Sequence, residues 1–225
     1  DGLAEVRELA DPLSLGFFLH QYGFFLLHDG DLQEASVLEQ ESYRLFAEFD
    51  HEGFMIGPLN GLGMIAYKRG DYHKAEELLN EALAMAKRTK FDFMEAIILG
   101  NLAKLATTLG DYVAAERHLV RSLDIGVRIA NPHNLTSTLV SLAGLRAAQG
   151  QAERAAIWAS LALHHPATEK HEKQEARQLL ETLRNRLSPE ELSKAKERGK
   201  QLDLMEVAKE ILAAIDADPT ESLTS

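Results

Sequence analysis

The sequence contains no cysteine, so it can form neither a disulfide bond nor a thiolate metal site. Its formal net charge of -11 would repel a phosphate backbone, which argues against direct binding of nucleic acid. No apolar run approaches the roughly 18 residues needed to cross a bilayer. The start also lacks a basic segment followed by an apolar one, the pattern that directs secretion. We therefore expect a cytoplasmic chain without membrane contact.

Strand-forming residues are also scarce, since aromatic residues make up only 7% of the chain. Long stretches rich in Ala, Leu, Glu and Lys favour helix instead. With 45% apolar and 26% charged residues, the chain can bury a sizeable core and keep an ordinary charged surface. The composition predicts an all-α fold.

One short pattern returns at a fixed interval of 40 residues. It consists of a glycine and, five positions later, an alanine: Gly30 with Ala35, Gly70 with Ala75, Gly110 with Ala115, and Gly150 with Ala155. A constant period of this size is typical of stacked helical repeats. The sequence therefore predicts repeats over residues 12–50, 52–90, 92–130 and 132–167.

Each repeat is expected to contain two antiparallel helices. The glycine ends the first helix in a left-handed conformation, and the aspartate after it, as at Asp31, Asp71 and Asp111, caps the second. Asp31 and Glu34 have the spacing of a capping box. Small residues in the first helices face the alanines of the second and allow close approach: Gly23, Gly63, Ala103 and Ala143.

These residues resemble the tetratricopeptide repeat, with Leu-Gly in the first helix, Gly at the turn and Ala early in the second. That repeat is usually about 34 residues long. The longer form is similar to the repeats of bacterial MalT-like regulators of the STAND NTPase or LuxR kind, over residues 1–167. The resemblance implies a right-handed superhelical solenoid of antiparallel helix pairs.

The end of the chain resembles the helical cap of such regulators, over residues 168–216. We expect a helix over 175–187, a capping box at Ser188 to Glu191, and a last helix from Asp203 through Ala213. Residues 217–225 have little to bury and should form a loose tail. Residues 1–10 match the end of a second helix in phase, which suggests that the chain is cut from a longer one.

By repeat phase, the first helices present residues to a concave partner-binding groove. In the first two repeats we single out Phe17, His20, Phe24, His28, Asn60, Met64, Tyr67 and Lys68. In the last two the inward positions include Lys104, Thr107, Val140 and Gly144. Such a groove suits a peptide or a partner helix. Alternatively, the aromatic residues simply pack against neighbouring repeats.

No cofactor or metal site is expected. His20 and His28 lie eight residues apart on one helix, about 12 Å, which is too far for one ion. Asp50, His51 and Glu52 invite an acid-base interpretation, but a solvated loop would leave their pKa values ordinary. The acidic helix with Glu34, Glu39, Glu41 and Glu48 is expected to present these carboxylates on a solvated outer face.

The sequence therefore predicts a non-enzymatic interaction or sensor domain of a bacterial signalling or transcriptional regulator. It would bind a protein, a peptide or a small effector in the groove. The alternative is a structural spacer and oligomerisation platform. In that case Leu3 and Val6 at the N-terminal edge would stack on upstream repeats or drive formation of a homodimer.

Overall fold

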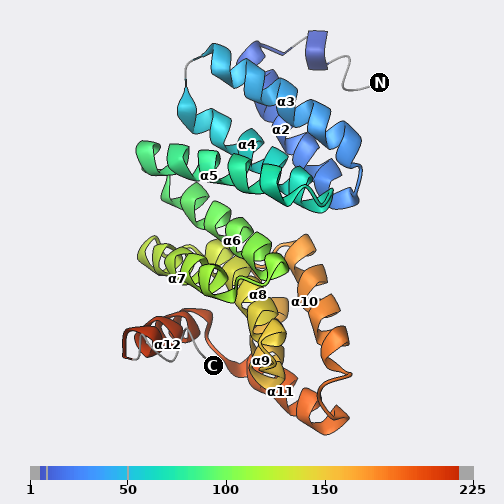
Figure 1. Cartoon of the computed structure of the whole chain (residues 1–225), viewed down its shortest axis with the longest axis vertical. Coiled ribbons are helices and arrows are strands. Elements are labelled where there is room, and N and C mark those ends of the chain that lie inside the picture. Colours follow the sequence, from blue (N-terminus) through green and yellow to red (C-terminus); the bar gives the residue numbers. More distant parts are fainter. Residues whose placement is uncertain (1–5, 9, 50, 218–225) are drawn as a thin grey trace. The chain divides into compact units, whose positions relative to one another are not determined.

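The computed structural model of the chain describes residues 6–8, 10–49 and 51–217. Every regular element within these residues is a helix, which confirms the all-α repeat fold (Figure 1). None of the described helices is long and apolar enough to span a bilayer. The chain divides into two compact units, residues 1–98 and 99–225.

The first unit contains two helix pairs, in which α2 packs on α3 and α4 packs on α5. Their bounds are α2 (Pro12–Asp29), α3 (Leu32–Glu48), α4 (Glu52–Lys68) and α5 (Tyr72–Thr89). Ala35 and Ala75 are fully buried, as the small-residue rows predicted. A Cβ atom added to Gly63 would lie only 2.8 Å from the side chain of Leu79. The two helices of a pair therefore touch through small residues.

The turns within the repeats also confirm the prediction. Their glycines all have positive φ angles, 101°, 79°, 81° and 84° at Gly30, Gly70, Gly110 and Gly150. Asp31, Asp71 and Asp111 each accept a hydrogen bond from the backbone N–H three residues later. These contacts satisfy one of the free amide groups at the start of each second helix.

Helix α6 (Asp92–Leu109) begins in the first unit and ends in the second. The second unit continues with α7 (Tyr112–Arg128), α8 (Pro132–Ala148), α9 (Ala152–His164), α10 (Lys170–Leu183), α11 (Pro189–Gln201) and α12 (Leu204–Ala217). Within it, α8 packs on both α7 and α9, and α10 and α11 pack on α9. Gly199 of α11 lies so close to α9 that an added Cβ would be 2.4 Å from the carbonyl oxygen of Ile157.

Two helices near the end of the chain differ from the prediction. The helix expected over 175–187 is α10, which begins at Lys170, because Glu169 and Glu172 form a capping box. It ends at Leu183 and not at Leu187. The next helix, α11, begins at Pro189 after its N-cap Ser188, as predicted. The last helix starts as expected after Asp203, which caps it, but continues beyond Ala213 to Ala217.

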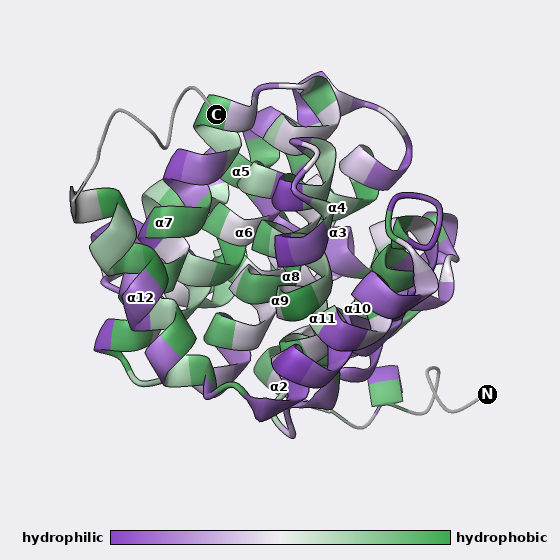
Figure 2. Ribbon diagram, turned by 90° about the horizontal axis from the view of Figure 1, so that it is seen from below, coloured by the Kyte–Doolittle hydropathy of each residue, from purple (hydrophilic) through white to green (hydrophobic). Residues whose placement is uncertain are grey.

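Helix α12 packs against α7 and α8. Its ribbon alternates between hydrophobic and hydrophilic residues (Figure 2), as an amphipathic helix should. The apolar side includes Val207, Ala208 and Ile211, all buried. The tail expected from residue 217 lies outside the described residues, apart from Ala217 itself.

Residues 6–8 are helical, in agreement with the phase expected for the start of the chain. The guanidinium of Arg7 forms an ion pair with Glu41 of α3 at 2.5 Å. Val6 is half-buried, and Leu3 lies outside the described residues.

Candidate functional site

Helix α2 carries two phenylalanines and two histidines that are expected on the binding face. Phe17 is 42% exposed, and its ring meets those of Phe46 and Phe54 edge to face, with centroids 4.9 and 5.0 Å apart. Phe24 is 36% exposed and contacts His28, with ring centroids 4.5 Å apart. Phe17 therefore belongs partly to the packing of its own unit, while Phe24 and His28 form a surface pair.

His20, also on α2, turns toward a buried carboxylate. Its Nδ1 atom lies 2.8 Å from Oε2 of Glu39 on α3, and the side chain of Glu39 is completely buried. The prediction that Glu39 lies on a solvated outer face is therefore wrong. Burial raises the pKa of Glu39, whereas the hydrogen bond with His20 and its charge lower the pKa; the burial effect is the larger.

Glycines make the room for this pair. A Cβ added to Gly61 of α4 would lie 2.6 Å from Oε1 of Glu39, and one added to Gly57 would lie 2.7 Å from Nε2 of His20. Oε1 of Glu39 has no hydrogen-bond partner among the described residues. Since both side chains are enclosed by their own unit, His20 is mainly a structural contact of α2, α3 and α4.

Helix α4 carries the other residues expected in the first unit: Asn60, Met64, Tyr67 and Lys68. The ammonium of Lys68 donates a hydrogen bond to the carbonyl oxygen of Leu27 at 2.8 Å, which satisfies a free carbonyl near the end of α2. Asn60 is buried, and Met64 and Tyr67 are half-buried. Of these four, Met64 and Tyr67 offer apolar surface beside Lys68.

In the second unit, four of the expected inward positions line one hollow of about 200 Å³. It is formed by α6, α8 and α10 and contains Lys104, Thr107, Val140 and Gly144. Lys104 spans it with an ion pair to both carboxylate oxygens of Glu175, at 2.8 and 3.0 Å. Nothing lies within 4 Å of a Cβ added to Gly144, so the hollow is open above this glycine.

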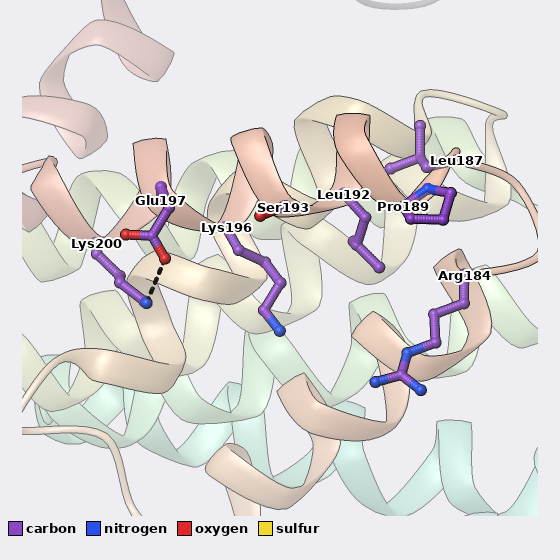
Figure 3. A pocket seen from close by; sticks show the side chains of 8 residues that line it. All are labelled: Arg184, Leu187, Pro189, Leu192, Ser193, Lys196, Glu197 and Lys200. Atoms are coloured by element: carbon purple, nitrogen blue, oxygen red, sulfur yellow. Dashed lines mark hydrogen bonds and ion pairs between the residues drawn. The ribbon is translucent and has the colours of Figure 1, made fainter.

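Helices α10 and α11 bound a further pocket that the sequence interpretation did not single out. It has a volume of about 460 Å³ and lies between the end of α10 and α11. Figure 3 shows Arg184 and Lys196 projecting to the same side of it, with Lys200 joined to Glu197 by an ion pair at 2.6 Å. Leu187, Pro189 and Leu192 supply its apolar part.

The candidate acid-base group near residue 51 holds helices together. Glu52 is the first residue of α4, and its oxygens accept hydrogen bonds from Arg88 at 2.8 and 3.2 Å. The hydrogen bond from Arg88 lowers the pKa of Glu52, and the ring of His51 stacks on Phe54 at 4.0 Å. Asp50 lies outside the described residues. Among residues 6–8, 10–49 and 51–217, no three His, Asp or Glu side chains are placed to hold a metal ion.

Glu39 and Arg146 are buried charged side chains that the sequence interpretation missed. The guanidinium of Arg146 on α8 forms a buried ion pair with Glu116 of α7 at 2.5 Å. The repeat phase contains a signal for both. Glu39 occupies the phase of Leu79, and Arg146 occupies the phase of Ala66, and both equivalents are core residues.

Three solved structures share the fold at low sequence identity. BtubC (BKLC) from P. vanneervenii is 20% identical, with a TM-score of 0.63 over 96% of this chain and 89% of that chain. The apo form of RapI is 14% identical, with a TM-score of 0.59 over 97% and 89%. TPR-like repeats of the kinesin light chain type from Podosopora anserina are 17% identical, with a TM-score of 0.53 over 93% and 100%.

The comparison with curated proteins finds no match. The model of the MalT-like TPR region matches residues 16–164, which is more than half of the chain and overlaps all four repeats expected from the 40-residue period. The chain is therefore a member of the MalT-like tetratricopeptide-repeat family.

Proposed function

We propose that this chain is a non-enzymatic interaction or sensor domain of a larger bacterial regulatory protein. It binds a protein, a peptide or a small effector through residues of its first helices. Repeats of this kind generally mediate protein interaction, and several charged groups of the described residues form ion pairs within the protein. The ion pairs of Glu52 with Arg88 and of Glu116 with Arg146 are examples.

The observation that carries the proposal is the hollow of the second unit. Lys104, Thr107, Val140 and Gly144 come from helices about 40 residues apart, yet they line one concave site. Thr107 supplies a hydroxyl group, and Val140 supplies apolar surface. A site with a few polar groups on an apolar lining is typical of specific recognition.

Panning a displayed peptide library on the purified chain tests the proposal. Peptides selected by the wild type should bind the Gly144→Arg variant at least roughly tenfold more weakly, because the new side chain fills a hollow that is open above Gly144. Val113→Arg is the matched control, since Val113 is 48% exposed on the second helix α7. If the selected peptides bind Gly144→Arg as tightly as Val113→Arg, the hollow is not the binding site.

A second candidate function, stacking or self-association, is favoured by the exposed face of α2. Phe18 and Phe25 are 41% and 61% exposed. Residues at the phase of Phe25 in later repeats, Ile65 and Leu145, are 2% and 0% exposed. In those repeats, this face is covered by the preceding second helix, α3 or α7. The α2 face therefore has the chemistry of a stacking surface for a homodimer or for another repeat.

Light scattering distinguishes this candidate from a monomeric interaction domain. Self-association predicts that the measured mass of the wild type exceeds that of one chain. The double variant Phe18→Glu with Phe25→Glu should have the mass of one chain. Val37→Glu is the control, because Val37 is 48% exposed on α3. A wild type that stays monomeric at all concentrations would contradict self-association.

A further inference from the structure

A pocket of about 390 Å³ lies in the second unit between α9 and α12. It is separate from the hollow formed by α6, α8 and α10, since the two share no lining residue. Trp158 of α9, the only tryptophan of the chain, forms one wall and is 7% exposed. Ile211 and Ile215 of α12 form an apolar wall. The volume is near the lower end of the roughly 300 to 1,000 Å³ found for small-molecule sites.

Charges of both signs converge on this pocket. Arg154 and Arg198 line it together with Glu153 and Glu210, and all four are exposed. None of them forms an ion pair with another residue of the described part of the chain. Two cations and two anions are therefore available to a ligand at the same apolar pocket.

The indole ring organises the positive charges. The guanidinium carbon of Arg154 lies 5.4 Å from the centroid of the Trp158 ring, and that of Arg146 lies 5.9 Å from it. Both distances are within the range of a cation–π interaction. The side chain of Arg154 is thus held over the Trp158 wall of the pocket, where it can contact an anionic group of a ligand.

Arg146 adds a buried polar group with an unused donor. Its two terminal nitrogens donate to Glu116 and to Gln149, at 2.5 and 2.6 Å. Its Nε atom is buried and has no hydrogen-bond acceptor in the described residues. Because Arg146 is paired with Glu116 and its Nε is enclosed by the protein, the cations within reach of a ligand are Arg154 and Arg198. These two side chains favour a carboxylate on their side of the pocket.

We propose that this pocket binds a free α-amino acid with an apolar side chain, such as leucine. The carboxylate is held on the Arg154 side, and the ammonium group is held by Glu153 and Glu210. The apolar side chain lies against Trp158 and the Ile211 wall. A ligand with only one charge would leave one set of side chains without a counter-charge, so the zwitterion fits best.

The fluorescence of Trp158 provides a direct test, because no other tryptophan contributes to it. Leucine titrated into the full chain should change the emission and saturate below about 10 mM. Two probes each lack one charge: 4-methylpentanoate has no ammonium group, and isopentylamine has no carboxylate. Each should bind at least roughly tenfold more weakly than leucine.

Variants test which charged side chains hold the carboxylate and the ammonium group of leucine. Calorimetric titration is the second readout of binding, and a thermal melt establishes that each variant is folded. Arg154→Gln should weaken binding of leucine roughly tenfold, and so should Glu210→Gln. Arg184→Gln, in the separate pocket between α10 and α11, is the matched control and should bind leucine as the wild type does. The proposal is overturned if leucine produces no saturable change, or if 4-methylpentanoate binds as tightly as leucine.

Discussion

Glu39 of α3 and His20 of α2 form a 2.8 Å hydrogen bond inside the first unit, and Glu39 occupies a core position that is apolar in the following repeats. Leu79 and Leu119 have the same phase as Glu39 and are fully buried. The carboxylate fits because Gly61 brings no side chain to this place. A glutamate side chain at this core position thus requires a glycine on the neighbouring helix.

Replacing Gly61 by alanine tests this dependence. The added methyl group would lie 2.6 Å from Oε1 and 2.8 Å from Cδ of Glu39, which is buried and cannot move aside freely. We expect a loss of about 1 to 3 kcal/mol in the free energy of unfolding.

Gly100→Ala is the control for the glycine change. Gly100 lies within α6, and nothing lies within 4 Å of its added Cβ. This substitution should stabilise the protein by about 0.5 to 1 kcal/mol, because alanine restricts the unfolded chain. Urea melts measure both variants. A neutral Gly61→Ala would contradict the close packing around Glu39.

The ionisation of Glu39 should make stability depend on pH. Burial raises the pKa of this carboxyl group above its ordinary value of 4.5, so the folded state holds the proton more tightly than the unfolded chain. Its contribution is fully present below the ordinary pKa and is lost as pH rises through the raised pKa.

The Glu39→Gln variant removes this titration. The free energy of unfolding of the wild type, minus that of the variant, should therefore fall as pH rises from below 4.5 to above the raised pKa of Glu39. Urea melts across that pH range give the difference directly. A difference that stays constant, or grows, with pH would show that the carboxyl group is not held in a desolvated site.

Breaking the ion pair of Glu116 and Arg146 should be costly. Arg146 is 8% exposed, so Glu116→Ala leaves a buried charge without its counter-ion. We expect a loss of about 3 to 5 kcal/mol. The double variant Glu116→Ala with Arg146→Leu should lose less, because Leu26 occupies the phase of Arg146 in the first repeat. A double variant less stable than Glu116→Ala would contradict this explanation.

The repeat period made most of the fold predictable. It placed the alanine row, the left-handed glycines and the aspartate caps, because each follows from a local requirement that recurs with the period. Four of the positions that it placed inward, Lys104, Thr107, Val140 and Gly144, lie in the lining of the α6, α8 and α10 hollow. Glu39 was assigned to the surface from its charge, although its phase, shared with Leu79, indicated a core position.

Other features could not be predicted, because the contacts join repeats to the cap. The ion pair of Lys104 with Glu175 links residues 71 positions apart, and Glu175 lies outside the repeats. The pocket at Trp158 depends on α12 folding back onto α7 and α8. The 40-residue period does not predict either arrangement, because neither contact recurs from repeat to repeat.

One repeat phase decides which residues of the helix pairs lie inside and which are available to partners. Ala75 and Ala115 are fully buried, whereas the side chain of His73, two residues before Ala75, is 84% exposed. Leucine at either alanine inserts atoms where two helix backbones meet and should cost about 1 to 3 kcal/mol. His73→Leu should change stability by no more than about 0.5 kcal/mol.

Urea unfolding midpoints of these three variants are the most direct test. We expect Ala75→Leu and Ala115→Leu to unfold at clearly lower urea concentrations than His73→Leu, which should have the midpoint of the wild type. Equal midpoints for all three would contradict the phase, and with it the assignment of the first helices to partner binding.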